Sequence, residues 1–196
     1  MRCRLISSLL AIPVALAFAS PAPAGLIANP GFDTAVPAND TGGGWTSVNI
    51  DFAGGWESTG GNPGAFFAIN DDGDANTDPR IEQTVRGLSI GETYVVTGDF
   101  KVNILEQGSP ADSFEVRLDA SPIATFDAPG PLGQWFPFSA SFQASSTQHT
   151  LAFAAETNGS DYDYGLDNVA IVPAPATLAL LGFGGLALCR RRGRAI

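Results

Sequence analysis

The chain has 196 residues, a length that favours a single domain, with 20 acidic and 10 basic side chains. All 20 acids lie in residues 25–171, where only four basic residues oppose them, an excess of 16 negative charges. This balance argues against nucleic acid as a partner, because nucleic-acid binding depends on Lys and Arg side chains that neutralise phosphates, and it leaves metal cations, neutral glycans and basic proteins.

Residues 1–24 have the organisation of a secretory signal peptide. Two arginines precede Leu5–Ala19, a mostly apolar stretch of 15 residues, and Ala22–Ala24 supplies the small residues that signal peptidase recognises. We therefore expect cleavage between Ala24 and Gly25, with Ala17–Ala19 as a second possible site. A membrane anchor is the alternative, but the apolar stretch is short for a span of about 20 residues.

Residues 25–171 show the two-residue alternation of apolar and polar side chains that is typical of β-strands. It is clearest in Thr93–Leu105, and clusters of Gly, Pro, Asn and Asp separate this segment from the others, as turns require. The other strand candidates are residues 65–70, 80–85, 114–118, 123–126, 136–142, 151–155 and 165–172. Eight to ten short strands in about 147 residues predict an all-β fold, a two-sheet antiparallel sandwich of the jelly-roll type.

An acidic run at residues 70–78 is one candidate metal site. Asp72, Asp74, Asn76 and Asp78 stand at alternate positions, a spacing that can place several oxygens around a hard cation. The run is not an EF-hand, because the required turn glycine and the final Glu are both missing. The alternative is a solvated loop between two strands.

Three tryptophans are candidate platforms for a sugar ring. Trp45 and Trp56 follow glycine-rich stretches, which favours a position on loops and makes them the predicted glycan-binding residues. Trp135 stands in an alternating run and is interpreted as a core or core-edge residue. The alternative for all three is ordinary packing, which is the usual role of aromatic residues in sandwiches.

The sequence gives little support to an enzyme. It contains no nucleophile-elbow, phosphate-loop or multi-histidine metal motif, and nothing isolates one carboxylate pair from the 20 acids. Cys3 and Cys189 lie in the terminal segments, so residues 25–171 contain no cysteine nucleophile, thiolate metal site or disulfide. The one histidine, His149, excludes a zinc site of several histidines and is interpreted as a surface residue rather than a base.

Four phrases in the central region together resemble the galactose-binding-like jelly roll of many extracellular carbohydrate-binding modules. They are residues 26–33 at the start, residues 81–94 around a glycine turn, the strand from Trp135 to Phe142, and residues 164–169 at the end. The resemblance spans nearly the whole central region. It implies a β-sandwich that often contains a structural calcium ion and sometimes binds glycans, and it does not imply catalysis.

The first and last strands of such a jelly roll usually lie near each other, which would bring Asp33 and Asp167 together. Their apolar neighbours Phe32, Leu166 and Val169 would turn inward and leave both carboxylates at the edge of the sandwich. With backbone carbonyls, the two carboxylates could complete an oxygen shell for calcium. The alternative is that both aspartates cap turns, and the Asp72–Asp78 run is the competing site.

The C-terminal residues 172–196 resemble the PEP-CTERM sorting segment of bacterial exported proteins. The features are the triplet Pro173-Ala174-Pro175 after Val172, an apolar run at Ala176–Cys189, and a final cluster that contains Arg190, Arg191 and Arg192. The resemblance implies recognition and removal by an exosortase, usually in bacteria that make exopolysaccharide. Ala174 stands where the family has Glu, which bears on the efficiency of sorting.

The apolar run has 14 residues, and as a helix it would measure roughly 21 Å against about 30 Å of hydrocarbon. The arginines after it favour a cytoplasmic C-terminus with the central domain outside. A simple tail anchor is the alternative to a processed segment.

The sequence therefore predicts a signal peptide (1–24), a β-sandwich (25–171) and a sorting segment (172–196) in an exported, non-catalytic protein of the cell surface or extracellular matrix. The expected partners are signal peptidase, an exosortase and extracellular polysaccharide, and the expected cofactor is calcium. The alternative function is a structural or adhesive envelope protein that binds other proteins and no sugar.

Overall fold

The computed structural model describes residues 25–51, 54–70, 78–105, 113–127, 130–156 and 162–175. Within these residues the regular elements are eleven β-strands. The strands are β1 (Thr41–Gly42), β2 (Trp45–Val48), β3 (Gly55–Gly61), β4 (Gly64–Ile69), β5 (Arg80–Arg86), β6 (Thr93–Leu105), β7 (Ser113–Leu118), β8 (Ser121–Asp127), β9 (Phe136–Gln143), β10 (Gln148–Glu156) and β11 (Tyr162–Pro173).

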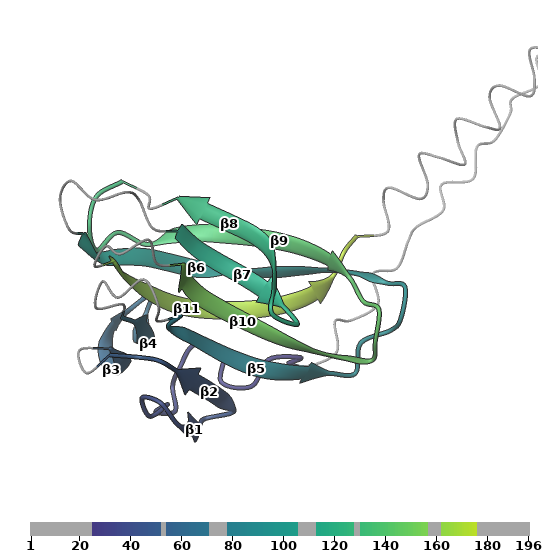
Figure 1. The fold of residues 1–196 in the computed structure, drawn as a ribbon, viewed down its shortest axis with the longest axis horizontal. Helices are drawn as coiled ribbons and strands as arrows, with labels where there is room; N and C mark the ends of the chain where they lie inside the picture. Colours follow the sequence, from purple (N-terminus) through teal and green to yellow (C-terminus); the bar gives the residue numbers. More distant parts are fainter. Residues whose placement is uncertain are drawn as a thin grey trace, which may run out of the picture.

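The strands form two antiparallel sheets that pack face to face (Figure 1). One sheet has six strands in the order β1-β2-β5-β10-β7-β8, and the other has five in the order β3-β4-β11-β6-β9. The predicted all-β, two-sheet sandwich is therefore confirmed, and each of the eight predicted strand segments coincides with an observed strand, one of them running a single residue past the end of β4. The sequence missed β1, β2 and β3, whose short, glycine-interrupted segments contain too little alternation to identify a strand.

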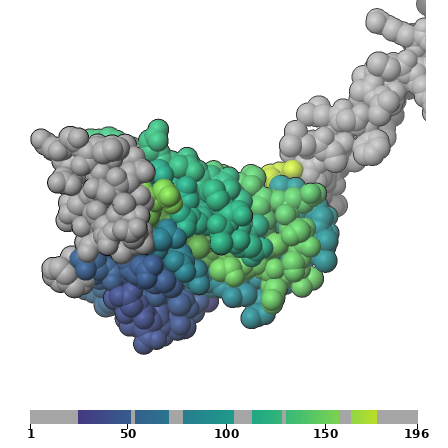
Figure 2. All heavy atoms as spheres, in the orientation of Figure 1, coloured from purple at the N-terminus to yellow at the C-terminus, as the bar shows by residue number. Residues whose placement is uncertain are grey.

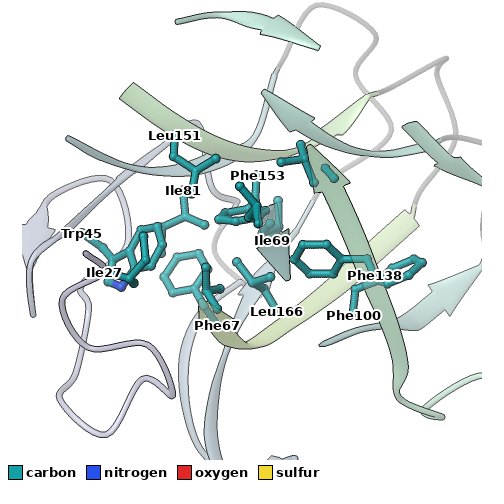
Figure 3. Packing of buried hydrophobic residues seen from close by; sticks show 14 of the residues in the cluster. Ile27, Trp45, Phe67, Ile69, Ile81, Phe100, Phe138, Leu151, Phe153 and Leu166 are labelled. Atoms are coloured by element: carbon teal, nitrogen blue, oxygen red, sulfur yellow. The ribbon is translucent and has the colours of Figure 1, made fainter. Parts of the chain in front are cut away.

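One hydrophobic core fills the space between the sheets (Figure 3). Phe114 from the six-stranded sheet stacks on Phe100 from the five-stranded sheet, with ring centroids 4.8 Å apart, and Phe138 and Phe153 pack around them. Each of these rings is at most 3% exposed, and every member of the core lies between Ile27 and Ile171. The described residues therefore contain a core of their own, typical of a domain that folds independently.

The two longest strands, β6 and β11, pair with each other at the centre of the five-stranded sheet. Their register shifts between Asp167 and Ala170, where Asn168 has a left-handed backbone with φ 53°. Such a β-bulge re-aims side chains and is common next to functional sites. The shift places the polar side chains of Asp167 and Asn168 beside Asp99 of β6.

The β1–β4 segment and the end of β11 occupy different ends of the sandwich. Figure 2 shows the segment from β1 to β4, in dark blue, gathered in one corner, while the yellow end of β11 lies at the opposite end. Among the described residues there is no helix of the length and apolarity needed to cross a membrane.

Candidate functional site

The structure places Trp45 in the core, not on a loop. Trp45 is 0% exposed, stacks on Phe32 with centroids 5.5 Å apart, and donates its Nε1–H to the carbonyl of Asn29 at 3.1 Å. Its ring has no free face for a sugar, so the prediction of Trp45 as a glycan-binding residue is wrong. Trp45 is buried because it is the first residue of β2, where alternate side chains point into the space between the two sheets.

Trp56 lies in β3 rather than on a loop, half-buried against the edge of the core. Its Nε1–H donates to the carbonyl of Phe32 at 2.7 Å, and its backbone pairs with the fully buried Phe67. The indole N–H already donates its hydrogen bond within the domain and is not available to a sugar. Trp56 is therefore a weaker candidate for sugar contact than its sequence context indicates.

Trp135 lies with Phe66 on the outer side of the five-stranded sheet. It is half-buried, directly before β9, and its ring meets the edge of Phe66 at a centroid distance of 5.7 Å. The Lys101 ammonium lies 3.7 Å from the centre of the Phe66 ring and 4.6 Å from that of Trp135. We call Trp135, Phe66 and Lys101 the aromatic–cation cluster, and contacts of this kind stabilise a cation over two ring faces.

Lys101 reaches these rings by crossing over Gly165, its partner on β11. A Cβ atom at Gly165 would lie only 2.7 Å from Lys101 Cε, so the crossing depends on the absence of a side chain there. Lys101 Nζ donates to the carbonyl of Gly60 at 2.9 Å. Burial lowers the pKa of Lys101, although the nearby charges of Asp167 and Glu57 partly oppose that effect.

A shallow hollow of about 490 Å³ lies further along the outer face of the same sheet. It is lined by the cross-strand pair Thr97 and Ser139, by Asp99, and by Asn168 from the bulge. Asp99 Oδ2 accepts hydrogen bonds from Asn168 Nδ2 at 2.9 Å and from Asn62 Nδ2 at 3.2 Å. The hollow thus offers hydroxyl, amide and carboxylate groups, the kinds of group that fix the orientation of a polar ligand.

The outer face of the six-stranded sheet has a second hollow, of about 480 Å³, with a different character. Arg117 dominates it and pairs with Asp78 and Glu115 at 2.7 Å each and with Glu156. Burial disfavours the charged form of Arg117 and by itself would lower its pKa. The hydrogen bonds to Asp78 and Glu115 and the negative charges of these residues outweigh burial, so the pKa of Arg117 is raised. The charged groups are already matched to one another, so this hollow offers less to a neutral ligand than the aromatic–cation side.

The structure brings the two predicted calcium ligands together beside Gly31. A Cβ atom at Gly31 would lie 3.8 Å from Asp167 Oδ1, 3.9 Å from Asn168 Oδ1 and 4.0 Å from Asp33 Oδ2, so three side-chain oxygens converge there. Oxygen donors of this type suit a hard cation such as calcium. Among the residues that the structure describes, no group of three His, Cys, Asp or Glu side chains meets the spacing of a metal site.

Asp167 is 0% exposed, whereas Asp33 is exposed. The Asp167 carboxylate accepts the backbone N–H groups of Asn62 at 2.6 Å and of Asn168 at 2.7 Å. Burial raises the pKa of Asp167, the two N–H donors oppose this, and the charges of Asp99 and Asp33 raise it further. The apolar neighbours Phe32, Leu166 and Val169 are buried as expected.

The backbone next to both aspartates is left-handed, with φ 54° at Phe32 and φ 53° at Asn168. For a bulky residue such as Phe this region is an outlier. Backbone strain of this type costs about 1–3 kcal/mol and tends to occur at ligand-binding sites.

The raised pKa of Asp167 predicts a pH dependence of stability in the presence of a chelator. The folded state binds this proton more tightly than the unfolded chain, so the contribution of Asp167 is most favourable below about pH 4, its unfolded pKa. That contribution is lost as the pH rises through the folded pKa. Urea unfolding of wild type and Asp167→Asn between pH 4 and 7 should show the wild type losing stability relative to the variant. A difference that stays constant with pH would contradict the raised pKa.

His149 is a buried residue, 4% exposed, and its interpretation as a surface residue is wrong. It shares the inward face of β10 with Leu151. Its Nε2 accepts the backbone N–H groups of Ser145 and Ser146 at 3.2 Å each, which leaves the proton on Nδ1, bonded to Asp119. His149 therefore organises the turn between β9 and β10, a structural role.

The predicted sorting segment begins inside the fold. Val172 and Pro173 are the last residues of β11, and the Ala174 N–H donates to the carbonyl of Thr93 at 2.8 Å. Pro175 is the last residue of this segment that the structure describes. The signal peptide with Ala24, the acidic residues Asp72 and Asp74, the apolar run and Arg190, Arg191 and Arg192 lie outside the described residues.

A comparison with known protein families bears on the C-terminal segment. Residues 172–194 match the family model of the PEP-CTERM protein-sorting motif, which indicates an exported protein anchored at the cell envelope. A comparison with curated protein sequences finds no match.

Solved structures of similar fold include carbohydrate-binding proteins. A protein of Bacteroides thetaiotaomicron described as sugar binding is 14% identical, with a TM-score of 0.59 over 76% of this chain and 99% of its own. The CBM22-1 xylan-binding domain of Paenibacillus barcinonensis Xyn10C is 15% identical, with a TM-score of 0.53 over 82% of this chain and 99% of its own.

The same fold also occurs in an enzyme. A cyclase of Fischerella sp. TAU, in complex with 4-(1H-indol-3-yl)butan-2-one, is 16% identical, with a TM-score of 0.55 over 80% of this chain and 99% of its own. At these identities the likeness shows the fold alone. The chain contains a two-sheet β-sandwich with the fold of these proteins, followed by a PEP-CTERM sorting motif.

Proposed function

We propose that the chain is an exported, non-catalytic protein of the cell envelope or extracellular matrix that binds polysaccharide through the outer face of its five-stranded sheet. The observation that supports this most is the placement of Trp135, whose ring is fixed by Phe66 and Lys101 on the same outer face as the hollow lined by Thr97, Ser139, Asp99 and Asn168. A fixed indole next to hydrogen-bonding groups is an arrangement that suits a sugar ring, because the apolar face of the sugar stacks on the aromatic plane.

The polar groups of the hollow complete this arrangement. The hydroxyls of Thr97 and Ser139 can each donate and accept a hydrogen bond, as sugar hydroxyls do. Asp99 is held in place by two amides and would accept from a sugar hydroxyl. The xylan-binding domain with the same fold supports a β-linked polysaccharide as the first ligand to test.

Export and sorting are the other half of the proposed function. The predicted signal peptide would be removed by signal peptidase between Ala24 and Gly25, and the C-terminal segment would be recognised by an exosortase. Ala174 in place of the motif's Glu is part of this segment and bears on how efficiently it is processed. In this proposal the apolar run anchors the chain in the membrane until the segment is removed.

We propose calcium as a structural cofactor at Asp33 and Asp167. The donor set fits a hard cation, since two carboxylate oxygens and the amide oxygen of Asn168 converge beside Gly31. A divalent cation would also offset the repulsion between the buried Asp167 and the charges of Asp33 and Asp99. Its expected role is to join the opening loop of the domain to β11, next to the hollow that Asn168 also lines.

A glycan array tests the binding half of this proposal. The domain from Gly25 to Pro175, which contains its whole core, is expected to bind one class of β-linked polysaccharide and to release no reducing ends from it. Binding to no glycan, together with capture of an envelope protein, would contradict the proposal and favour the structural or adhesive function. Release of reducing ends would contradict the non-catalytic role.

A further inference from the structure

The sandwich ends very close to the start of the apolar run. The β6–β11 ladder continues through Val172 and Pro173, and Ala174 is bonded to Thr93 of β6. The apolar run starts at Ala176, only two residues later. Two residues span at most about 7 Å, because an extended chain covers about 3.3–3.6 Å per residue.

The end of the sandwich that lies next to this exit is formed by two turns that are bonded to each other. Gly87 donates to Thr147 at 3.0 Å and Gly91 to Ala144 at 2.8 Å, so the β5–β6 turn and the β9–β10 turn form one surface. Figure 1 shows both turns beside the end of β11. We call residues 87–92, residues 144–147 and Val172 the tail-side end.

The tail-side end is unusual in its exposed apolar side chains. The described residues include three exposed large hydrophobic side chains, and two of them, Ile90 at 67% and Val172 at 39%, lie here. Ile90 is in the β5–β6 turn and does not belong to the hydrophobic core formed by the described residues. The third, Leu132 at 53%, precedes β9, away from this end.

The charge of the tail-side end also differs from that of the rest of the domain. Of the 20 acidic residues in the chain, only Glu92 falls within its two turns, and Arg86 precedes them. An anionic lipid surface repels acidic protein surfaces. The tail-side end, with one acidic residue in its two turns, is therefore repelled only weakly by such a surface.

The start of the described chain lies at this end as well. Leu26 Cδ2 is 3.9 Å from the position of a Cβ atom at Gly87, so Leu26 packs beside the β5–β6 turn. The two predicted membrane-directed segments, which precede Gly25 and follow Pro175, thus join the domain on the same side.

We propose that the tail-side end rests on the lipid surface of the membrane while the C-terminal segment is still attached. Ile90 would enter the headgroup region, and the aromatic–cation cluster would stay in water. This proposal rests on the sorting part of the proposed function, because the apolar run must lie in the membrane for its short connection to bring the domain there.

Depth-dependent fluorescence quenching tests the proposal. The chain from Gly25 to Ile196, with Cys189→Ser, is labelled with the fluorophore NBD at Ile90→Cys or, as the matched control, at Leu132→Cys. It is reconstituted into vesicles of phosphatidylethanolamine and phosphatidylglycerol that contain a lipid with a quencher in its headgroup region. We expect blue-shifted emission and a loss of fluorescence for the label at residue 90, and neither change for the label at residue 132.

Each other outcome has a distinct meaning. If the chain does not float with the vesicles, the sorting segment is not a membrane anchor, and both the proposed sorting and this inference are wrong. If it floats but the two labels are quenched equally, or neither is, only the inference is wrong. A flexible Gly/Ser insert between Pro175 and Ala176 should reduce quenching at residue 90, because it lengthens the connection. Quenching that persists would support an affinity of Ile90 itself for lipid.

Discussion

Replacement of Phe114 by Ala is expected to lower the free energy of unfolding by about 3–5 kcal/mol, the usual cost of removing a buried Phe ring. Phe114 is 0% exposed and joins the two sheets, since it stacks on Phe100 across the core and packs on Phe153 within its own sheet. The remaining cavity cannot close easily, because its walls belong to strands fixed in both sheets. Urea unfolding of the domain measures this loss.

The matched control is Leu132→Ala, at an apolar but 53% exposed position. Surface substitutions of this type usually change stability by no more than about 0.5 kcal/mol. A loss below about 1 kcal/mol for Phe114→Ala would contradict the central role of the aromatic core, because buried Phe-to-Ala changes in cores are consistently larger.

Calcium at 100 times its dissociation constant is expected to stabilise the domain by about 2.7 kcal/mol relative to the domain in chelator. The gain arises because the cation binds the folded site at Asp33 and Asp167 and not the unfolded chain. Thermal melting with calcium and with chelator measures it. Asp33→Ala and Asp167→Ala should each abolish the difference, whereas Asp74→Ala, in the competing acidic run, should leave it unchanged.

An equal melting temperature with and without calcium would remove the calcium proposal. Loss of the difference in Asp74→Ala alone would move the site to the acidic run. Asp167→Ala also removes the acceptor of two backbone N–H groups, so Asp33→Ala, at an exposed position, is the cleaner of the two variants.

The sequence predicted the fold well because the long strands carry a strong local signal. The alternation in Thr93–Leu105 locates β6, and the closing phrase around Asp167 locates β11, the two strands at the centre of one sheet. The alternation in β10 also predicts that His149 points inward, because His149 stands two positions before the buried Leu151. Its polar identity led to the surface interpretation, and its three hydrogen-bond partners explain why it can be buried.

The candidate binding site was harder to predict because its contacts are nonlocal. Trp135 and Lys101 meet only because Gly165, on a third strand, leaves space for the lysine to cross. No local pattern distinguishes this lysine from a solvated one. Trp45 was misplaced for a similar reason, since its burial depends on Phe32 and Phe153 from other parts of the chain.

Titration of the domain with the polysaccharide identified on the array tests the central claim most directly. Wild type should bind, and Trp135→Ala should weaken binding by about 1–3 kcal/mol, the worth of one aromatic contact of this kind. Thr84→Ala, an exposed substitution on the six-stranded sheet, should bind as wild type. Unchanged affinity in Trp135→Ala, or a loss of affinity in Thr84→Ala alone, would contradict a polysaccharide site on the five-stranded sheet.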